Sequence, residues 1–408
     1  MGHIQVHWIG YFRCFEAPMR KIRVVFFAEI LIPDFDGASR TMFQLLDRID
    51  ASRFEFLFVC GSGPDRINQF DCIQTRSISI PLNPKYKLAV PSLTADKIIV
   101  RLEQFKPDVV HIATPSLLGH FAMTYARDRH LPVISIYHTH FPGYISYYFS
   151  YLPFLINPIT DRLTTIQNRF YEVCKLVYVP SVSLAEELVS KGMSGRNIKI
   201  WQRGIDTTLF SPVKKDPQYL KSLTNNELPT ILFASRLVWE KNLETLIAVY
   251  NNLRAEGFRC NWVIAGDGTA MKDCIRQMPE AIFVGKLDHH ALAVLYASAS
   301  VFIFPSISET FGNVVLEAMA SGLVPIIADG GGSRDMVVDG VNGFKCEPDN
   351  AHEYAEKIRM LLQDQALRME MAANAVNHSK AFDWEQLAKV YFDDLDELAT
   401  TVTENLKI

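Results

Sequence analysis

The sequence alternates short apolar runs with amphipathic helical segments over almost its whole length. The first run, Ile22 to Ala28 (IRVVFFA), is continuous, which is typical of a central parallel strand that is buried on both faces. This alternation of strand and helix patterns predicts an α/β protein with parallel, doubly wound sheets. The expected strands are 22–28, 54–60, 109–112, 133–136, 176–179 and 198–201 in the first half, and 230–234, 262–265, 281–284, 301–304 and 324–328 in the second.

The length of the chain indicates more than one domain. A chain of 408 residues is long for a single hydrophobic core, and the two series of strands each fit one Rossmann-like unit. We therefore expect an N-terminal domain over 19–210, a linker over 211–228 and a C-terminal domain over 229–380. The amphipathic helix in 381–408 is expected to pack on either domain, including back on the first. Residues 1–18 lack the continuous apolar stretch of a signal peptide and are interpreted as a disordered or mis-assigned extension.

One strand–loop–helix–strand unit in the second half carries two carboxylates at a suggestive spacing. The stretch 305–335 reads PSISETFGNVVLEAMASGLVPIIADGGGSRD, with Glu309 in the loop and Glu317 in the predicted helix. Eight helical residues would place these acids about 12 Å apart. The helix N-terminus at the carboxyl edge of a parallel sheet can hold a phosphate. Two acids that flank such a phosphate would suit a sugar nucleotide, which has a hydroxylated ring at each end.

Further candidates follow other strands of the second half at the same sheet edge. Arg236 follows the strand 230–234, and Lys241 lies five residues later in the segment ASRLVWEKN. Two fixed cations suit a diphosphate whose negative charge grows as it leaves, although an ordinary salt bridge between Arg236 and Glu240 is an equal alternative. Gly266 and Gly268 (AGDG) end another strand, and the turn GGGSRD at 330–335 does the same. Their convergence on one edge predicts a ligand site.

The N-terminal half contributes Gly37 at its first strand-to-helix turn, where a glycine lets the backbone approach a ligand closely. The preceding segment Asp34-Phe35-Asp36 could be read as a metal-binding D-x-D. We prefer a turn in which the aspartates form Asx-type hydrogen bonds with the backbone.

Composition narrows the class of partner and the compartment. The formal net charge of −4 does not indicate nucleic acid, but residues 1–205 balance to +6 and 206–408 to −10. Chance is one explanation, and a basic first domain that faces an anionic membrane surface is the other. Seven cysteines occur without a C-x-x-C pair, which favours free thiols in a reducing compartment. We expect a cytoplasmic protein, or one that is peripheral on the inner face of the plasma membrane.

The segment from Leu131 to Thr160 contains no Asp, Glu, Lys or Arg. Its prolines and many polar residues argue against a membrane span. A buried strand followed by an aromatic loop is one interpretation. The other is an aromatic lip that binds a lipid-linked or glycan acceptor or lies at a bilayer interface.

These motifs together resemble the retaining family-four glycosyltransferases, which have the two-domain GT-B fold with a cleft between Rossmann-like domains. The resemblance rests on E-x7-E from Glu309 to Glu317, on the segments SRLVWEKN, AGDG and ETFGNVVLEAMASG, and on RGIDTTLF at 203–210. The runs TFGNVVLEAMASG and HTHFPGY are most similar to the branch with sulfoquinovosyldiacylglycerol synthases and bacterial lipid mannosyl- and glucosyltransferases. The resemblance covers nearly the whole chain from about residue 20, more loosely in the N-terminal half.

The resemblance assigns roles to the candidates. It implies that the C-terminal domain binds the donor and the N-terminal domain the acceptor. Arg236, Lys241 and Gly37 would bind the donor diphosphate, with Ala38 in place of the second glycine that many relatives carry. Arg203, Gly266 and Gly268 are further cleft candidates. The transferring sugar would contact the Glu309 carboxylate, and Glu317 would hold the ribose hydroxyls. The backbone N–H groups around the sugar would come from Phe311, Gly312, Asn313 and Val314.

The sequence departs from the family at one catalytic position. Many relatives carry a histidine two residues after the histidine of the D-V-V-H strand end, which is His111 here, but this chain has Ala113. We predict that His138, at the end of the next strand, substitutes for this histidine near the reacting carbon. A buried core histidine is the alternative interpretation.

The resemblance implies a hexosyltransferase that moves a sugar with retention from a UDP- or GDP-sugar to a hydroxyl of a lipid or glycan. No cofactor and no metal ion are expected, because Arg236, Lys241 and a helix N-terminus could neutralise the diphosphate. A GT-B sugar-nucleotide epimerase and a non-catalytic nucleotide-sugar-binding subunit stay open. A nicotinamide-dependent dehydrogenase is disfavoured, since no G-x-G-x-x-G follows Ala28.

Overall fold

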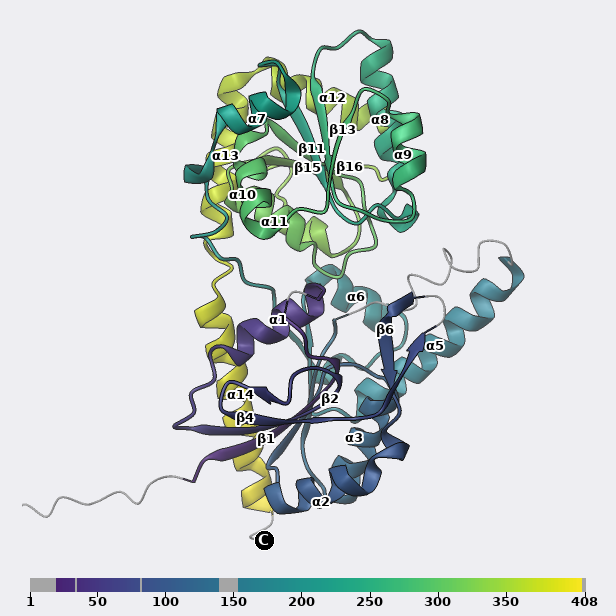
Figure 1. Cartoon of the computed structure of the whole chain (residues 1–408), viewed down its shortest axis with the longest axis vertical. Coiled ribbons are helices and arrows are strands. Elements are labelled where there is room, and N and C mark those ends of the chain that lie inside the picture. Colours follow the sequence, from purple (N-terminus) through teal and green to yellow (C-terminus); the bar gives the residue numbers. More distant parts are fainter. Residues whose placement is uncertain (1–19, 34, 81–82, 139–152, 406–408) are drawn as a thin grey trace, which may run out of the picture.

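The computed structural model describes residues 20–405 apart from 34, 81–82 and 139–152. Two α/β lobes lie end to end, and each is built around its own sheet (Figure 1). The predicted fold class, with two doubly wound parallel-sheet domains in the GT-B arrangement, is confirmed. Most of the predicted aromatic loop lies outside the described residues.

The sheet of the N-terminal lobe has the strand order β10-β9-β8-β7-β1-β2-β4-β3. All its neighbouring strands are parallel except β3 and β4, which pair antiparallel. A separate antiparallel pair, β5 and β6, lies beside it. The strands are β1 (Ile22–Ile30), β2 (Phe54–Ser62), β3 (Arg66–Ile67), β4 (Phe70–Gln74), β5 (Ser77–Ile80), β6 (Asn83–Ala89), β7 (Val109–Ile112), β8 (Val133–Ile136), β9 (Leu176–Val179) and β10 (Ile198–Ile200).

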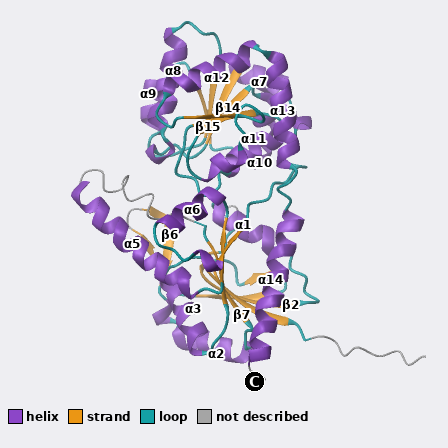
Figure 2. Ribbon diagram, turned by 180° about the vertical axis from the view of Figure 1, so that it is seen from behind, coloured by secondary structure: helices purple, strands orange, loops and turns teal. Residues whose placement is uncertain are grey.

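Helices cover both faces of this sheet, because every central strand is apolar on both sides. One face packs on α1 and on the C-terminal helix α14, and the other packs on α2, α3 and α6. The helix α5 packs on this second face through Phe170 and Tyr171 near its end, while its beginning extends away from the lobe (Figures 1 and 2). The helices are α1 (Gly37–Leu46), α2 (Ala95–Phe105), α3 (Leu117–Asp128), α5 (Pro153–Val173), α6 (Val182–Ser190) and α14 (Trp384–Asn405), with short 3-10 turns η1 (Pro91–Leu93) and η3 (Gly195–Asn197).

The last helix, α14, returns from the C-terminal lobe and packs along the N-terminal one (Figure 1). Trp384, Tyr391 and Leu395 are buried in the same cluster as the β1 and β2 side chains. The Tyr391 hydroxyl lies 2.8 Å from Nδ1 of His111 on β7, and Leu387 accepts a 2.9 Å hydrogen bond from the Trp201 indole. The C-terminal segment is therefore part of the N-terminal lobe's core.

The sheet of the C-terminal lobe is parallel throughout, with the order β13-β12-β11-β14-β15-β16. Its strands are β11 (Thr230–Ala234), β12 (Asn261–Ala265), β13 (Ile282–Gly285), β14 (Val301–Phe304), β15 (Val324–Ala328) and β16 (Phe344–Cys346). The surrounding helices are α7 (Pro217–Thr224), α8 (Leu243–Ala255), α9 (Met271–Gln277), α10 (His289–Ser298), α11 (Asn313–Ala320), α12 (Ala351–Gln363) and α13 (Gln365–Ser379), with 3-10 turns η4 (Pro212–Lys214), η5 (Trp239–Lys241) and η6 (Gly332–Met336).

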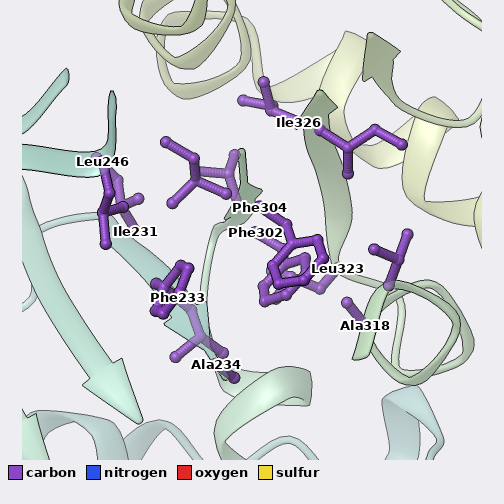
Figure 3. Packing of buried hydrophobic residues seen from close by; sticks show 14 of the residues in the cluster. Ile231, Phe233, Ala234, Leu246, Phe302, Phe304, Ala318, Leu323 and Ile326 are labelled. Atoms are coloured by element: carbon purple, nitrogen blue, oxygen red, sulfur yellow. The ribbon is translucent and has the colours of Figure 1, made fainter. Parts of the chain in front are cut away.

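One hydrophobic cluster forms the core of the C-terminal lobe. Phe302 and Phe304 of β14 stack with ring centroids 5.9 Å apart, and Phe233 of β11 lies 6.2 Å from Phe304 (Figure 3). Ala318 of α11 packs in the same cluster. This packing fixes α11 relative to β14, and so it fixes the loop between them.

Each sheet has a point where the strand order reverses, between β1 and β7 in the first and between β11 and β14 in the second. Ligands of open α/β sheets bind outside the carboxyl ends of the strands at such a point. The loops after β11 and β14 carry Arg236 and Glu309, and the loop after β1 leads to Gly37. The topology alone therefore brings these candidates to the two switch points.

Several local details differ from the sequence-based expectation. Strands β3, β4 and β16 and the β5–β6 pair were not predicted, because polar and charged residues interrupt the continuous apolar runs by which the other strands were recognised. Helix α5 begins at Pro153, inside the uncharged segment 131–160, and contains Pro158. Of the Asp-Phe-Asp segment, Asp34 lies outside the described residues. Asp36 caps α1, since its carboxylate accepts a 2.8 Å hydrogen bond from the Ser39 N–H, as the turn interpretation predicted.

Candidate functional site between the two lobes

A lysine–carboxylate pair lies at the switch point of the second sheet. Lys241 Nζ is 2.5 Å from Glu309 Oε1 and 3.0 Å from the Ser308 hydroxyl. The Lys241 side chain is only 5 % exposed, whereas that of Glu309 is 21 % exposed. The structure therefore brings together two of the predicted site residues, and the carboxylate holds the ammonium group at the edge of the sheet.

Arg236 follows β11 on the same edge but points outward. Its guanidinium donates a 2.8 Å hydrogen bond to Glu240, and 63 % of its side chain is exposed. This is the salt bridge that the sequence offered as the alternative to a ligand contact. The two interpretations are compatible, because a guanidinium has five N–H donors and can contact a phosphate while it stays paired with Glu240, whose side chain is only 8 % exposed.

The loop between β14 and α11 ends in a left-handed residue. Gly312 has φ +91° and forms the N-cap of α11, a conformation that residues with a Cβ rarely adopt. The backbone N–H groups of 311–314 donate to no group within the described part of the chain. These are the orphan donors of a helix N-terminus, and they form an anion-binding arrangement at the place where the sequence predicted one.

The turn after β15 braces this loop. Gly332 donates a 2.7 Å backbone hydrogen bond to the Glu309 carbonyl. A Cβ on Gly332 would lie 2.1 Å from the Thr310 carbonyl oxygen, so only glycine permits this approach. The glycine-rich turn 330–332 therefore supports the loop.

Glu317 lies in the second turn of α11 and is almost fully buried. Its Oε2 accepts a 3.3 Å hydrogen bond from the Tyr296 hydroxyl, and its Oε1 lies 3.4 Å from Nη1 of Arg40. The pKa of the Tyr296 hydroxyl is raised. Burial of the ring is the larger cause, and the neighbouring Glu317 carboxylate adds to it. Tyr296 therefore stays protonated and can donate to this carboxylate.

The N-terminal lobe reaches this region through α1. A Cβ built on Gly37 would lie 3.8 Å from the Asn313 side-chain amide, which is ordinary contact with the first residue of α11. One turn later, Arg40 Nη1 lies 2.7 Å from Nε2 of His289 and also contacts Glu317, both of which belong to the other lobe. The first turn of α1 therefore faces the N-terminus of α11 across the cleft.

Gly266 and Gly268 have a packing role. Gly266 has φ +131°, and a Cβ there would lie 1.8 Å from the Ser235 carbonyl oxygen. A Cβ on Gly268 would lie 2.2 Å from the Leu237 carbonyl oxygen. The turn after β12 thus packs backbone against backbone on the turn that carries Arg236, which it positions.

His138 and Arg203 lie together on the N-terminal side of the cleft, after β8 and β10. Arg203 Nη2 is 3.3 Å from His138 Nδ1, and both side chains are buried. The His138 carbonyl accepts a hydrogen bond of 3.4 Å from Thr310, which is the neighbour of Glu309. Burial, and then the charge of Arg203, lower the pKa of His138, so the imidazole is neutral at pH 7.

Other contacts join the lobes beside the site. Ser181 donates a 3.0 Å hydrogen bond to the Thr310 carbonyl, and the Ser183 N–H donates to the Asp335 carboxylate at 2.9 Å. The lobes therefore meet directly around the loop 309–312.

Sequence reasoning missed three residues around Glu317, of which Arg40 and His289 join the two lobes and Tyr296 lies in the same lobe as Glu317. Arg40, Tyr296 and His289 contact site residues or one another, yet none belongs to a recognised motif. Arg40 offered one signal, since it lies three residues after Gly37 and therefore on the same side of α1. Tyr296 and His289 gave none, because their partners are distant in the sequence.

Comparison with known proteins agrees with this geometry. The family model "Glycosyltransferase Family 4" matches residues 35–209, and "Glycosyl transferases group 1" matches 215–378. A GDP-mannose-dependent alpha-mannosyltransferase of Mycobacterium tuberculosis is 30 % identical over 78 % of this chain and 82 % of its own length. The chain belongs to the family-four glycosyltransferases with the GT-B fold. It is a glycosyltransferase of the branch that the sequence motifs indicated, as predicted.

Two further proteins are similar to this chain in sequence or in fold. A sulfoquinovosyl transferase of Arabidopsis thaliana is 32 % identical over 76 % of this chain, which spans 60 % of the plant protein. A sucrose-phosphate synthase of Thermosynechococcus elongatus superposes with a TM-score of 0.76 at 20 % identity, covering 93 % of this chain and all of that one. The latter is a likeness of fold.

No helix among the described residues is both long and apolar enough to cross a membrane. They also contain no group of three or more His, Cys, Asp or Glu residues arranged to hold a metal ion.

Proposed function

We propose that this glycosyltransferase moves a hexose-type sugar, with retention of configuration, from a nucleoside diphosphate sugar to a hydroxyl of a lipid or glycan acceptor. The observation that carries the proposal is the convergence of the Lys241–Glu309 pair and the free N–H groups of α11 on one switch point. A cation and a helix N-terminus suit the diphosphate, and the partly exposed carboxylate of Glu309 beside them suits sugar hydroxyls.

The two acids have different roles in this proposal. Glu309 contacts the transferring sugar beside Lys241, and the N–H groups of 311–314 surround that sugar. Glu317 holds the ribose hydroxyls, and it does so from a buried position next to Tyr296. Arg236 and Lys241 bind the diphosphate from the C-terminal lobe, while Gly37 faces it from α1.

The chemistry that this arrangement supports is mostly positioning and charge stabilisation. The bond between the anomeric carbon and the diphosphate breaks, and the acceptor oxygen forms its bond on the same face. The diphosphate leaves with the bonding electron pair, and one of its oxygens takes the acceptor proton. Lys241 and Arg236 stabilise the charge that grows on the leaving group, so the reaction requires neither a protein nucleophile nor a metal ion.

The names of relatives support a class of donor and a class of acceptor separately. A relative whose name specifies GDP-mannose supports a nucleoside diphosphate sugar as donor, and we propose a UDP- or GDP-sugar; the name of the sulfoquinovosyl transferase specifies only the sugar that it transfers. The name of the alpha-monoglucosyldiacylglycerol synthase of Streptococcus pneumoniae, 26 % identical over 76 % of this chain, supports a lipid acceptor. We therefore propose a donor site in the C-terminal lobe and an acceptor site in the N-terminal lobe, with peripheral contact to an anionic membrane.

Separate substitutions of the two acids test this assignment. Glu317→Ala should weaken nucleoside diphosphate binding roughly 10- to 100-fold, because hydrogen bonds to a charged group are lost. Glu309→Ala should mainly lower kcat, by roughly 100-fold or more, because it removes a contact that strengthens in the transition state. Calorimetry measures the first and steady-state kinetics the second.

A matched control is Glu370→Ala, which removes an exposed carboxylate of α13 and should change neither quantity. If Glu309→Ala and Glu317→Ala have equal or negligible effects on both nucleoside diphosphate affinity and kcat, the assignment of separate roles to the two acids is wrong.

A further inference from the structure

Arg203 is a buried cation without an acidic partner. Only 4 % of the residue is exposed, and no carboxylate in the described part of the chain pairs with its guanidinium. Burial lowers its pKa to about 9, so the group is still charged at pH 7. A buried charge without a counter-charge costs several kcal/mol, and such charges in proteins are usually paired or serve a ligand.

The contact between Arg203 and His138 determines which nitrogen of the imidazole carries the proton. An arginine can only donate hydrogen bonds, so Nδ1 of His138 accepts from Nη2 of Arg203 at 3.3 Å. The neutral ring then carries its proton on Nε2. His138 therefore presents an N–H donor at Nε2, on the side of the ring away from Arg203. A general base would need an unprotonated nitrogen there.

Two donors are left without a partner at this place. Neither Nε2 of His138 nor Nη1 of Arg203 forms a hydrogen bond with any described residue, although both atoms are buried. Trp201 closes one side of the guanidinium, with its ring centroid 5.8 Å from Cζ. Buried polar atoms are rarely unsatisfied in proteins, so two unsatisfied donors on adjacent side chains indicate a ligand that accepts.

The position of the pair points to the reacting end of the cleft. His138 is joined by its carbonyl to Thr310, and Glu309 precedes that residue. Lys241, the buried cation of the other lobe, already has Glu309 as its partner. Arg203 is thus a second buried cation near the loop 309–312, and it is free to balance a negative ligand.

We propose that Arg203 and His138 form an anion-binding pair: Nη1 of Arg203 donates to a tetrahedral oxyanion, a phosphate or sulfonate, beside the transferring sugar, and the Nε2–H of His138, on the far side of its ring, donates to a second oxygen of the same bound ligand. The oxyanion belongs either to the donor diphosphate or to an anionic group on the sugar or acceptor. The location beside the sugar rests on the proposed function, whereas the affinity for an oxyanion does not.

The substitution Arg203→Met tests the pair, because Met keeps much of the buried volume and removes the charge. The ligand-free variant should be no less stable than the wild type, since it loses an uncompensated charge. Its affinity for inorganic phosphate should fall roughly 10- to 100-fold, because a charge-assisted hydrogen bond is lost. The matched control is Arg254→Met, which removes an exposed arginine and should leave phosphate affinity unchanged.

Further probes identify the source of the oxyanion. Loss of GDP or UDP affinity in Arg203→Met, with guanosine or uridine binding unchanged, assigns the pair to the donor diphosphate. Loss of glycerol 3-phosphate affinity alone assigns it to an anionic acceptor or sugar. If the wild type binds phosphate more tightly than Arg203→Met does, but no nucleoside diphosphate binds, the proposed function fails and the anion-binding pair stands.

Nitrogen-15 NMR of His138, assigned with His138→Gln, supplies a readout that a merely structural arginine would not give. The wild type should show the Nε2–H tautomer, and Arg203→Met should show a mixture of both tautomers. The proposal is overturned if the variant binds every probe like the wild type, if it is clearly less stable without ligand, or if His138 carries its proton on Nδ1.

Discussion

The two lobes share one architecture but build their sides of the cleft differently. In the C-terminal lobe, the candidates lie in compact segments that each follow one strand, such as 236–241 and 309–317. In the N-terminal lobe, the candidates come from three segments far apart in the sequence: Gly37 begins α1, and His138 and Arg203 follow β8 and β10. The core of that lobe is also completed by α14, which is the last helix of the chain.

This difference shows how each side depends on the rest of the fold. The C-terminal side is set by local backbone geometry, namely a left-handed glycine, a helix N-terminus and a supporting turn. The opposite side is set by the order of strands in the sheet, since β8 and β10 bring His138 and Arg203 together only after the whole sheet has formed. Substitutions far from the cleft should therefore disturb the N-terminal side more than the C-terminal one.

The largest effect is expected from Trp384→Ala at the start of α14. The indole is buried beside Trp201, with ring centroids 6.1 Å apart, and it contacts Gly204. Its removal should cost about 3–5 kcal/mol of stability in the N-terminal lobe. Urea denaturation with hydrogen exchange, read separately for each lobe, measures this loss.

The control on the same helix is Val390→Ala, which removes a partly exposed side chain and should change stability by about 0.5 kcal/mol or less. Loss of protection mainly in the C-terminal lobe of Trp384→Ala would show that α14 does not belong to the first core.

A smaller and more local effect is expected from Gly266→Ala in the C-terminal lobe. The new methyl group would overlap the Ser235 carbonyl, and the φ of +131° is unfavourable for alanine. We expect a loss of about 1–3 kcal/mol from the backbone strain, and a displaced turn that weakens donor binding through Arg236. Denaturation and nucleotide titration measure the two effects.

Gly285→Ala is the matched control, because Gly285 also has a positive φ, +70°, but a Cβ there would meet nothing within 4 Å. It should lose about 1 kcal/mol from conformation alone and keep its donor affinity. Equal loss of donor affinity in both variants would break the link between this turn and the site.

The smallest effect concerns charge on the two halves, +6 for 1–205 and −10 for 206–408. If the N-terminal lobe docks on membranes, the protein should bind anionic vesicles, and this binding should fall as salt rises because screening shortens the Debye length. Each basic residue near the surface contributes about 1 kcal/mol. Co-sedimentation measures this, with neutral vesicles as the control. Absence of binding at every salt concentration would favour a soluble acceptor.

Much of the fold was predictable because both sheets are built from continuous apolar strands. Glu309, Lys241 and Gly312 could be placed at one sheet edge because each lies within a short motif that follows a strand of the C-terminal lobe. The contacts of Arg40 with Glu317 and of Arg203 with His138 were not predictable, since they join residues that are 277 and 65 positions apart. Such contacts depend on how the sheets and lobes are packed, which no local pattern records.

His138 shows the limit of sequence reasoning most clearly. Its place at the end of β8 left a catalytic and a structural interpretation open. The structure adds a neutral ring, a cationic neighbour and an unsatisfied Nε2, which together favour a role as a hydrogen-bond donor to ligand. No feature of the local sequence could indicate this, because the residue that sets the tautomer lies on another strand.

The most direct test of the account is product analysis with purified enzyme, a panel of UDP- and GDP-sugars and lipid or glycan acceptors. Proton NMR of the product reports the anomeric configuration, and coupled detection reports the released nucleoside diphosphate. The account predicts release of UDP or GDP in proportion to a new glycoside that keeps the anomeric configuration of the donor. An inverted product, an epimerised free sugar nucleotide, or donor binding without turnover with any acceptor would contradict it.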